Sequence, residues 1–142
     1  MSGIRGKDTR PELLIRLALH RLGFRYRLHN RNLPGRPDLV LPRYGAAIQV
    51  HGCFWHGHDC HLFKWPSSRV KFWRSKIEGN RARDALSSAE LSRLGWRTLT
   101  IWECALKGRT RRDLAMTIAR IARWIRSGKG HLEIRGTDDG AR

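Results

Sequence analysis

The 142-residue sequence lacks long apolar runs, an even set of cysteines and any internal repeat. A transmembrane helix needs roughly 20 consecutive apolar residues, so we expect no segment that spans a membrane. Three cysteines are odd in number and too few for a disulfide framework, and no signal peptide opens the chain. These absences predict one domain in a reducing cytoplasm, with thiols available for a metal ion.

Acidic residues are also scarce. The chain has 12 Asp and Glu against 29 Lys and Arg, which gives a formal net charge of +17 and an isoelectric point near 11.5. A field this positive favours a polyanionic partner, and nucleic acid is the obvious one. The helical segments carry aliphatic stripes instead of an aromatic face opposite a basic one, so a membrane-surface role is not expected.

Chemistry-bearing residues are concentrated in residues 50–61, VHGCFWHGHDCH. Three soft or borderline ligands lie there, and the third cysteine of the chain can complete a tetrahedral zinc site. The predicted ligands are Cys53, His58, Cys60 and Cys104. His56 is an alternative ligand in place of His58. Because four protein ligands leave no open position, this zinc is expected to be structural.

A second constellation begins at Pro37-Asp38, directly before the apolar segment 39–41. Gln49 and His51 lie two residues apart on the next predicted strand and so share a face. An acid on one hairpin strand and polar groups on its partner are typical of the PD-(D/E)xK nucleases, which bind a divalent cation. Here Gln49 stands where the second acid is usual and His51 where the lysine is usual. A turn-forming aspartate is the ordinary alternative for Asp38.

Periodicity predicts an α/β fold, with a mixed sheet flanked by helices. We expect strands at 24–28, 39–41, 46–50, 96–102 and 132–134. Thr9 should cap a first helix, with Glu12 as a capping-box residue, an active-site carboxylate, or both. Its predicted apolar face is Leu13, Leu14, Leu17 and Ala18.

A long helical stretch runs from a Ser68 cap to Gly95, as one helix or as two joined near Gly79. Its first half carries many basic residues, which form either a solvated face or a surface that follows DNA phosphates. A closing helix should begin near Asp113 and end at Ser127-Gly128. We expect residues 1–135 to form a single domain and residues 136–142 to be a disordered tail.

Four stretches of this sequence resemble the very short patch repair (Vsr) endonucleases, in order and spacing. They are LPGRPD at 33–38, HGCFWHGHDC at 51–60, KWP at 64–66 and WECAL at 102–106. The resemblance implies a restriction-endonuclease-like core with a zinc-stapled loop. It also implies a magnesium-dependent nick in double-stranded DNA, 5′ to the T of a T:G mismatch arising from 5-methylcytosine deamination.

The resemblance also implies roles for individual residues in catalysis. Asp38 would bind Mg²⁺ through its carboxylate, and Val50 would bind the same ion through its backbone carbonyl. His56 would activate the attacking water and would be oriented by Glu12. His51 would contact the region of the scissile phosphate. The zinc ligands inferred above match those of the family.

Further residues match the family's DNA contacts. Phe54, Trp55 and Trp73 would wedge into the base stack beside the mismatch, and Lys76 and Asn80 would contact the mismatched pair. Insertion costs a few kcal/mol per base step, and a wobble pair lowers that cost. The plain alternatives are that the aromatic residues pack in the core and that Lys76 is one more basic surface residue.

Three functional hypotheses remain at this point. The chain is a mismatch-nicking endonuclease, a nuclease of the same fold that cuts modified or foreign DNA, or a non-catalytic DNA-binding module stabilised by zinc. A single-strand nick requires only a monomer. The resemblance implies mismatch-repair proteins as possible partners, which the sequence does not identify.

Overall fold

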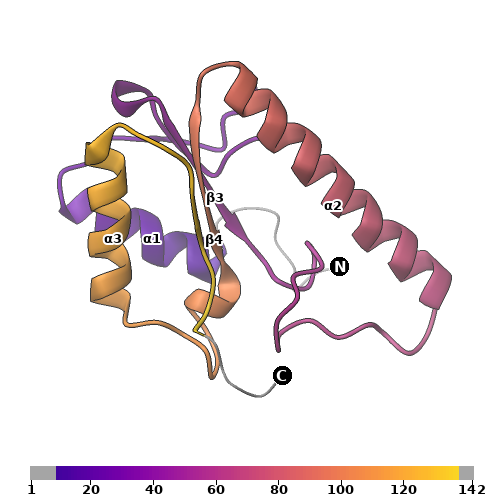
Figure 1. The fold of residues 1–142 in the computed structure, drawn as a ribbon. Coiled ribbons are helices and arrows are strands. Elements are labelled where there is room, and N and C mark those ends of the chain that lie inside the picture. The colour runs from indigo at the N-terminus through magenta and orange to yellow at the C-terminus, as the bar shows by residue number, and fades with distance from the viewer. Residues whose placement is uncertain (1–8, 138–142) are drawn as a thin grey trace.

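In the computed structural model, which describes residues 9–137, five strands form one mixed sheet in the order β1-β2-β3-β4-β5 (Figure 1). The strands are β1 (Arg27–Leu28), β2 (Leu39–Leu41), β3 (Ala46–His51), β4 (Arg97–Trp102) and β5 (Leu132–Ile134). The pairs β1–β2 and β2–β3 are antiparallel, whereas β3–β4 and β4–β5 are parallel. The predicted mixed sheet flanked by helices is confirmed. The predicted strand at 24–28 is shorter, because only Arg27 and Leu28 pair with β2.

The two faces of this sheet have different chemistry, because alternate residues of a strand point to opposite sides. Ile48, Leu99 and Ile101 are fully buried in the main core. That core is covered by α1 (Arg10–Arg21) and α3 (Leu114–Ser127), which lie on one side of the sheet (Figure 1). The opposite face, which carries Thr98 and Thr100, lines a cavity below α2 (Val70–Arg93). The polar groups of β3 and β4 therefore point away from the core.

Helix α1 begins as predicted: the Thr9 side chain accepts a hydrogen bond from the backbone N–H of Glu12 at 3.4 Å. Its predicted apolar face is confirmed only in part: Ala18 packs against the core, but the fully buried positions are others. The buried side chains are Glu12, Ile15 and Leu19, whereas Leu17 is 54% exposed. Leu13 and Leu14 are only half-buried. Contacts with the rest of the core determine which side of α1 is buried, and that side carries Glu12 together with Ile15 and Leu19.

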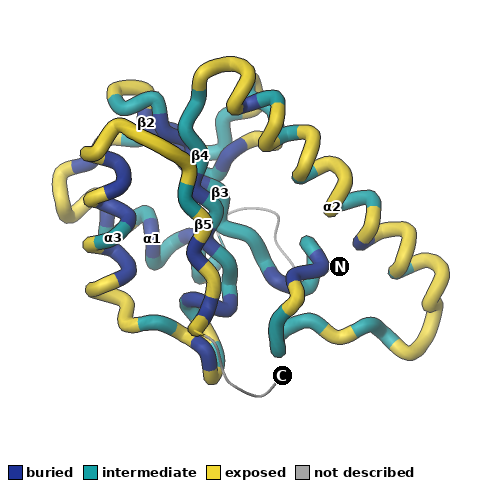
Figure 2. The backbone as a smooth tube through the Cα atoms, viewed as in Figure 1, coloured by how far each residue is buried: buried dark blue, intermediate teal, exposed yellow. Residues whose placement is uncertain are grey.

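Helix α2 is one continuous helix of 24 residues, and Gly79 does not interrupt it. Its N-cap is Arg69, in a left-handed conformation with φ of 52° and no side-chain cap, so the predicted Ser68 cap is wrong. Only Ile77 and Leu91 are buried along α2, and Figure 2 shows exposed residues along much of its length. The helix is therefore packed lightly, and much of its surface is available to a ligand.

Helix α3 closes the core. Asp113 caps it by accepting a hydrogen bond from the N–H of Met116 at 2.9 Å, and Gly128 ends it in a left-handed conformation. The chain then forms β5, after which the N–H of Thr137 donates to the carbonyl of Thr110 at 2.8 Å. Residues 138–142 of the predicted tail lie outside the described residues. Within residues 9–137, no helix is long and apolar enough to cross a membrane.

Candidate active site and metal centre

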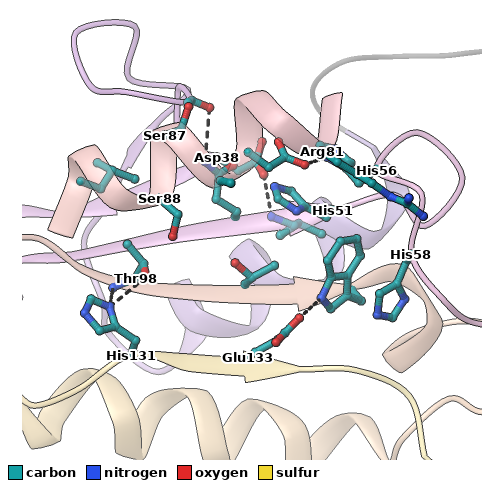
Figure 3. Close-up of a pocket in the computed structure, with 18 of the residues that line it drawn as sticks. Asp38, His51, His56, His58, Arg81, Ser87, Ser88, Thr98, His131 and Glu133 are labelled. Atoms are coloured by element: carbon teal, nitrogen blue, oxygen red, sulfur yellow. Dashed lines mark hydrogen bonds and ion pairs between the residues drawn. The ribbon is translucent and has the colours of Figure 1, made fainter. Parts of the chain in front are cut away.

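A cavity of about 1010 Å³ lies between α2 and the polar face of the sheet (Figure 3). Asp38, His51 and His56 line it from the strand side and the following loop, and Asp84 lines it from α2. The structure therefore brings three of the four predicted catalytic residues into one cavity.

Asp38 is held at the start of the β2–β3 hairpin. Asp38 directly precedes β2, and its Oδ2 accepts a hydrogen bond from the N–H of Val50 on β3 at 2.7 Å, so the carboxylate is tied to the neighbouring strand. Burial raises the pKa of Asp38 to about 6, and the negative charge of Glu12 adds to this effect. Carboxylate oxygens in such a setting suit a hard divalent cation. The carbonyl of Val50 as a further ligand stays a prediction.

Glu12 is only 2% exposed, and its Oε2 lies 2.7 Å from Nε2 of His29 and 3.0 Å from a guanidinium nitrogen of Arg16. Ligand atoms of Glu12, His29 and Asp38 all lie within 4.8 Å of one another. The second carboxylate predicted for the site is therefore beside the first.

The carboxylate that contacts His56 belongs to another residue. Nδ1 of His56 lies 2.5 Å from Oδ2 of Asp84, on α2. The prediction that Glu12 orients His56 is thus corrected: Glu12 is engaged by His29 and Arg16, and Asp84 holds the imidazole. An ionised carboxylate accepts a hydrogen bond, so this contact favours the tautomer with the proton on Nδ1.

The rings of His51 and His56 are stacked, with centroids 3.9 Å apart and planes 5° from parallel. Burial lowers the pKa of His51 to about 3, and the neighbouring His56 lowers it further. His51 is therefore neutral at physiological pH. The lone pairs of an imidazole lie in the ring plane, so two stacked rings cannot both point at one ion. Ligand atoms of His51, His56 and Asp84 lie within 4.8 Å of one another, but in this arrangement His56 is hydrogen-bonded to Asp84 and His51 only stacks on His56.

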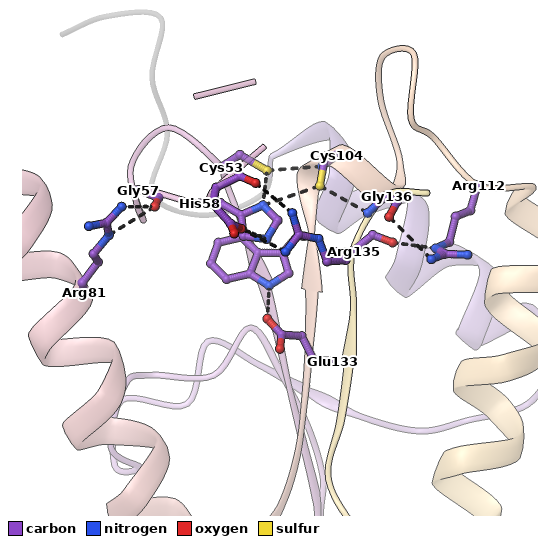
Figure 4. Close-up of polar contacts among 11 residues, drawn as sticks. Cys53, Gly57, His58, Arg81, Cys104, Arg112, Glu133, Arg135 and Gly136 are labelled. Carbon is purple, nitrogen blue, oxygen red and sulfur yellow. Dashed lines mark hydrogen bonds and ion pairs between the residues drawn. The ribbon is translucent and has the colours of Figure 1, made fainter. Parts of the chain in front are cut away.

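The predicted zinc ligands converge at the end of the sheet, and Figure 4 shows three of them, Cys53, His58 and Cys104. Ligand atoms of Cys53, His58, Cys60 and Cys104 all lie within 4.8 Å of one another. Nδ1 of His58 is 3.5 Å from Sγ of Cys53 and 3.6 Å from Sγ of Cys104. A tetrahedral zinc ion would set such sulfur and nitrogen atoms about 3.5 Å apart. The cluster fits zinc, and His58 takes the position for which His56 was the alternative.

Backbone donors surround the sulfurs of this zinc cluster. The N–H of Cys104 donates to Sγ of Cys53, and the N–H of Gly136 donates to Sγ of Cys104, each at 3.3 Å. The pKa of Cys104 is lowered to about 3, chiefly because the Cys53 thiol donates to it, and the same hydrogen bond raises the pKa of Cys53. The cluster thus favours a thiolate, which is the form that binds a metal.

The predicted wedge residues are in mutual contact beside the zinc cluster. The ring centroid of Phe54 is 5.3 Å from that of Trp55 and 5.4 Å from that of Trp73, and the two tryptophans are 5.7 Å apart. All three side chains are half-buried. The structure therefore joins them into one aromatic cluster that is partly accessible.

The two predicted base-reading residues on α2 differ in their surroundings. Lys76 is exposed. Asn80 is engaged within the protein: its Nδ2 donates to the carbonyl of Trp55 at 2.7 Å, and its Oδ1 accepts from Arg83 at 2.5 Å. Asn80 thus braces the loop that carries the aromatic cluster.

Comparison with known proteins identifies the family. The family model for the DNA mismatch endonuclease Vsr matches residues 1–62. The DNA mismatch endonuclease Vsr of Escherichia coli is 44% identical over 126 residues, which cover 88% of this chain and 80% of that protein. The chain belongs to the Vsr family.

Two type II nicking enzymes are also similar to this Vsr-family chain. V.XorIIP of Xanthomonas oryzae is 49% identical over 106 residues, covering 75% of this chain and 78% of the relative. V.NmeAIP of Neisseria meningitidis is 41% identical over 109 residues, covering 77% and 78%. The chain is therefore a DNA endonuclease, and the hypothesis of a non-catalytic module is set aside.

Sequence reasoning missed Asp84, His29 and Arg81 at this Vsr-family site. Asp84 had a signal: it is an isolated acid in a basic stretch, four residues after Asn80 and so on the same helical face. No sequence signal pointed to His29 or Arg81, because His29 contacts a glutamate 17 residues away and Arg81 contacts a backbone carbonyl. Gln49, which stands at the usual position of an acid, donates to the carbonyl of Gly35 at 3.2 Å and braces the neighbouring loop.

Proposed function

We propose that this Vsr-family chain makes a magnesium-dependent single-strand nick in duplex DNA, 5′ to the T of a T:G mismatch left by deamination of 5-methylcytosine. The nick would initiate very short patch repair. The names of the relatives support a nicking reaction, and one of them is a mismatch endonuclease. Because one chain carries the whole set of candidate catalytic residues, we infer that it acts as a monomer.

The proposal rests on one observation. Asp38, a carboxylate suited to a metal ion, and His56, a histidine hydrogen-bonded to a carboxylate, line the same cavity. Asp38, His56 and Asp84 all line it, and the charge of His56 acts on the pKa of Asp38. Phosphodiester hydrolysis needs both groups, one to balance charge on the phosphate and one to take a proton from water.

The two histidines of the cavity would have separate roles in the hydrolysis. Asp84 fixes the proton on Nδ1 of His56, which leaves Nε2 free to accept a proton from the attacking water. His51 stays neutral and can donate one N–H to a phosphate oxygen. Its Nδ1 is buried and has no hydrogen-bond partner among residues 9–137, so Nε2 would be the nitrogen that donates.

Two carboxylates would hold the cation. Asp38 and Glu12 provide oxygen donors, with His29 and Arg16 fixing the direction of Glu12. Magnesium bound there would supply positive charge to the scissile phosphate. The zinc cluster, whose four ligands are all protein, would hold the loop that carries His56 and would take no part in the chemistry.

The aromatic cluster and Lys76 would supply the specificity. Phe54 and Trp55 lie on the same loop as His56, the catalytic loop between β3 and α2, and Trp73 contacts them from α2; unstacking a base step is easier next to a wobble pair. Lys76 is exposed on the same helix as Asp84, so it can reach the mismatched pair or its backbone.

The deciding experiment is a nicking assay on two labelled duplexes that differ only in one T:G or C:G pair, with magnesium or with EDTA. We expect one magnesium-dependent cut 5′ to the mismatched T and none in the C:G duplex. Asp38→Asn is the control variant, which should bind DNA and cut at least about 100-fold more slowly. Equal cutting of both duplexes would contradict the mismatch specificity.

One observation favours the second candidate, a Vsr-family nuclease with another DNA target. The amide group of Asn80 has partners on both sides within the protein, so it is not free to contact bases in this conformation. If the T:G duplex and the C:G duplex are cut equally, duplexes with modified cytosine are the next substrates to compare.

A further inference from the structure

Helix α2 holds the catalytic loop through three side chains. Asn80 donates to the carbonyl of Trp55, Asp84 contacts the ring of His56, and Arg81 donates to the carbonyl of Gly57. These contacts engage three consecutive residues of the loop. The first serves the aromatic cluster and the second the proposed base, whereas the third has no assigned role.

Arg81 approaches Gly57 very closely. Its Nε donates to the carbonyl oxygen of Gly57 at 3.1 Å, and its Nη2 donates to the same oxygen (Figure 4). Gly57 has φ of +59°, and a Cβ at this position would lie 2.5 Å from Nε of Arg81 and 2.6 Å from Cγ2 of Ile77. The helix can therefore reach this carbonyl only because residue 57 has no side chain.

The carbonyl that Arg81 holds lies between two functional residues. His56 precedes Gly57, and the zinc-cluster residue His58 follows it. The zinc cluster restrains this turn from one side, and Arg81 restrains it from the other (Figure 4). With a glycine in a left-handed conformation at its centre, the turn would otherwise have considerable backbone freedom.

We propose that Arg81 is a positioning residue: by fixing the Gly57 carbonyl it holds the backbone of His56, so that the imidazole meets both Asp84 and the attacking water. This inference rests on the proposed role of His56. A guanidinium suits the task because two of its N–H groups can share one acceptor in a fixed geometry. Arg81 thereby couples the position of the catalytic loop to that of helix α2.

The test compares Arg81→Ala with Arg81→Lys and Arg93→Ala. Arg93 lies on the same helix, is exposed, and forms an ion pair with Glu90, so its replacement removes an equal charge without touching the loop. The measurements are the dissociation constant for the duplex that the wild type nicks and the single-turnover nicking rate at saturating enzyme.

For Arg81→Ala we expect a nicking rate about 10- to 100-fold lower, because a small displacement of a catalytic group is enough for such a loss. Its DNA affinity should change no more than that of Arg93→Ala. Arg81→Lys should recover part of the rate, since it keeps one donor. A weaker affinity with an unchanged saturating rate would make Arg81 a phosphate contact and would overturn the proposal.

A second measurement does not depend on activity. Hydrogen exchange of the peptide that covers residues 53–58 should be faster in Arg81→Ala than in the wild type or in Arg93→Ala. The absorption spectrum of the Co²⁺-substituted protein should be the same in all of them, because the four ligands are untouched. Unchanged exchange would overturn the inference, whereas failure of the wild type to nick any duplex would overturn the proposed function.

Discussion

Asp84 is the residue through which helix α2 reaches the imidazole of His56. A carboxylate at Nδ1 does two things for a general base: it selects the tautomer, and it stabilises the imidazolium that forms when the base accepts a proton. The same reasoning applies at the buried Glu12, whose direction is set by His29 and Arg16. With the roles proposed above, the reactivity of this site would depend on side chains that do not meet the substrate.

Asp84→Asn is the sharpest test of this arrangement. The amide keeps the shape but removes the charge, and it can leave His56 with the wrong tautomer. We expect the single-turnover nicking rate to fall about 100-fold or more, with little change in DNA affinity. A rate within a factor of about two of the wild type would show that Asp84 does not assist the base.

Asp38 predicts a pH dependence. Its folded-state pKa is raised to about 6, so the protonated form dominates below that pH and the carboxylate above it. Without a cation, the stability that Asp38 contributes is fully present below its ordinary pKa and is lost as the pH rises through about 6. A divalent cation competes with the proton, so apparent Mg²⁺ affinity should fall about tenfold per unit below pH 6.

Calorimetric titration with Mg²⁺ between pH 5 and pH 8 measures this effect. The affinity should level off above about pH 7, where the carboxylate is fully ionised. Asp38→Asn should bind the ion weakly at every pH. An affinity that does not change between pH 5 and pH 7 would contradict the assignment of Asp38 as the cation ligand.

At the scale of elements, the C-terminal strand and the segment after it close the zinc cluster. Arg135 pairs with Oδ1 of Asp59 at 2.9 Å, and the N–H of Gly136 donates to Sγ of Cys104. A Cβ at Gly136 would lie 2.6 Å from the carbonyl oxygen of Cys104, so this segment fits only with glycine there. Hydrogen bonds to metal-bound sulfur commonly tune how firmly a metal is held.

Gly136→Ala should therefore release zinc faster. With a chromogenic chelator in excess, we expect a release rate about tenfold or more above that of the wild type. Gly79→Ala is the matched control, because a Cβ there would have its closest contact, 3.4 Å, with a flexible arginine side chain. Cys104→Ser gives the upper limit, with zinc lost on purification. Equal release rates for the wild type and Gly136→Ala would contradict the role of this segment.

The elements also show which features the sequence could predict. Alternation and capping residues identified most of the helices and strands, and the spacing of Cys53, His58 and Cys60 indicated three of the candidate zinc ligands, because these signals are local. Cys104 is distant in sequence and could be predicted only because it is the one other cysteine of the chain. The buried face of α1 was missed, because it is chosen by contacts with a distant sheet. The partner of His56 was missed for the same reason, since Asp84 is 28 residues away along the chain.

At the scale of the whole molecule, the net charge of +17 should act mainly through one side. Helix α2 carries basic residues next to the candidate active-site cavity, whereas the arginines of α3 lie on the other side of the sheet (Figure 1). The charge next to the cavity is the one that can meet DNA phosphates during cleavage.

The salt dependence of DNA binding separates the two sides. Replacing exposed Arg74 on α2 by Ala should reduce the slope of log affinity against log salt by about 0.9, the value for one lost phosphate contact. Arg123→Ala on α3, which is also exposed, should leave the slope unchanged. Equal changes of this slope in the two variants would mean that DNA affinity depends only on the total charge of the protein.

The zinc cluster joins residues that are 51 positions apart, Cys53 and Cys104, and the whole of α2 lies between them. With zinc bound, these ligands would cross-link a loop of this length, and the entropy relation for disulfides gives such a link a value of about 4 kcal/mol at 25 °C. Three ligands lie close together in sequence, so an unfolded chain can hold the ion before Cys104 arrives. The parallel pairing of β3 with β4 otherwise needs a long search through chain conformations. Metal supply during synthesis would thus determine how quickly the newly made chain reaches its native topology.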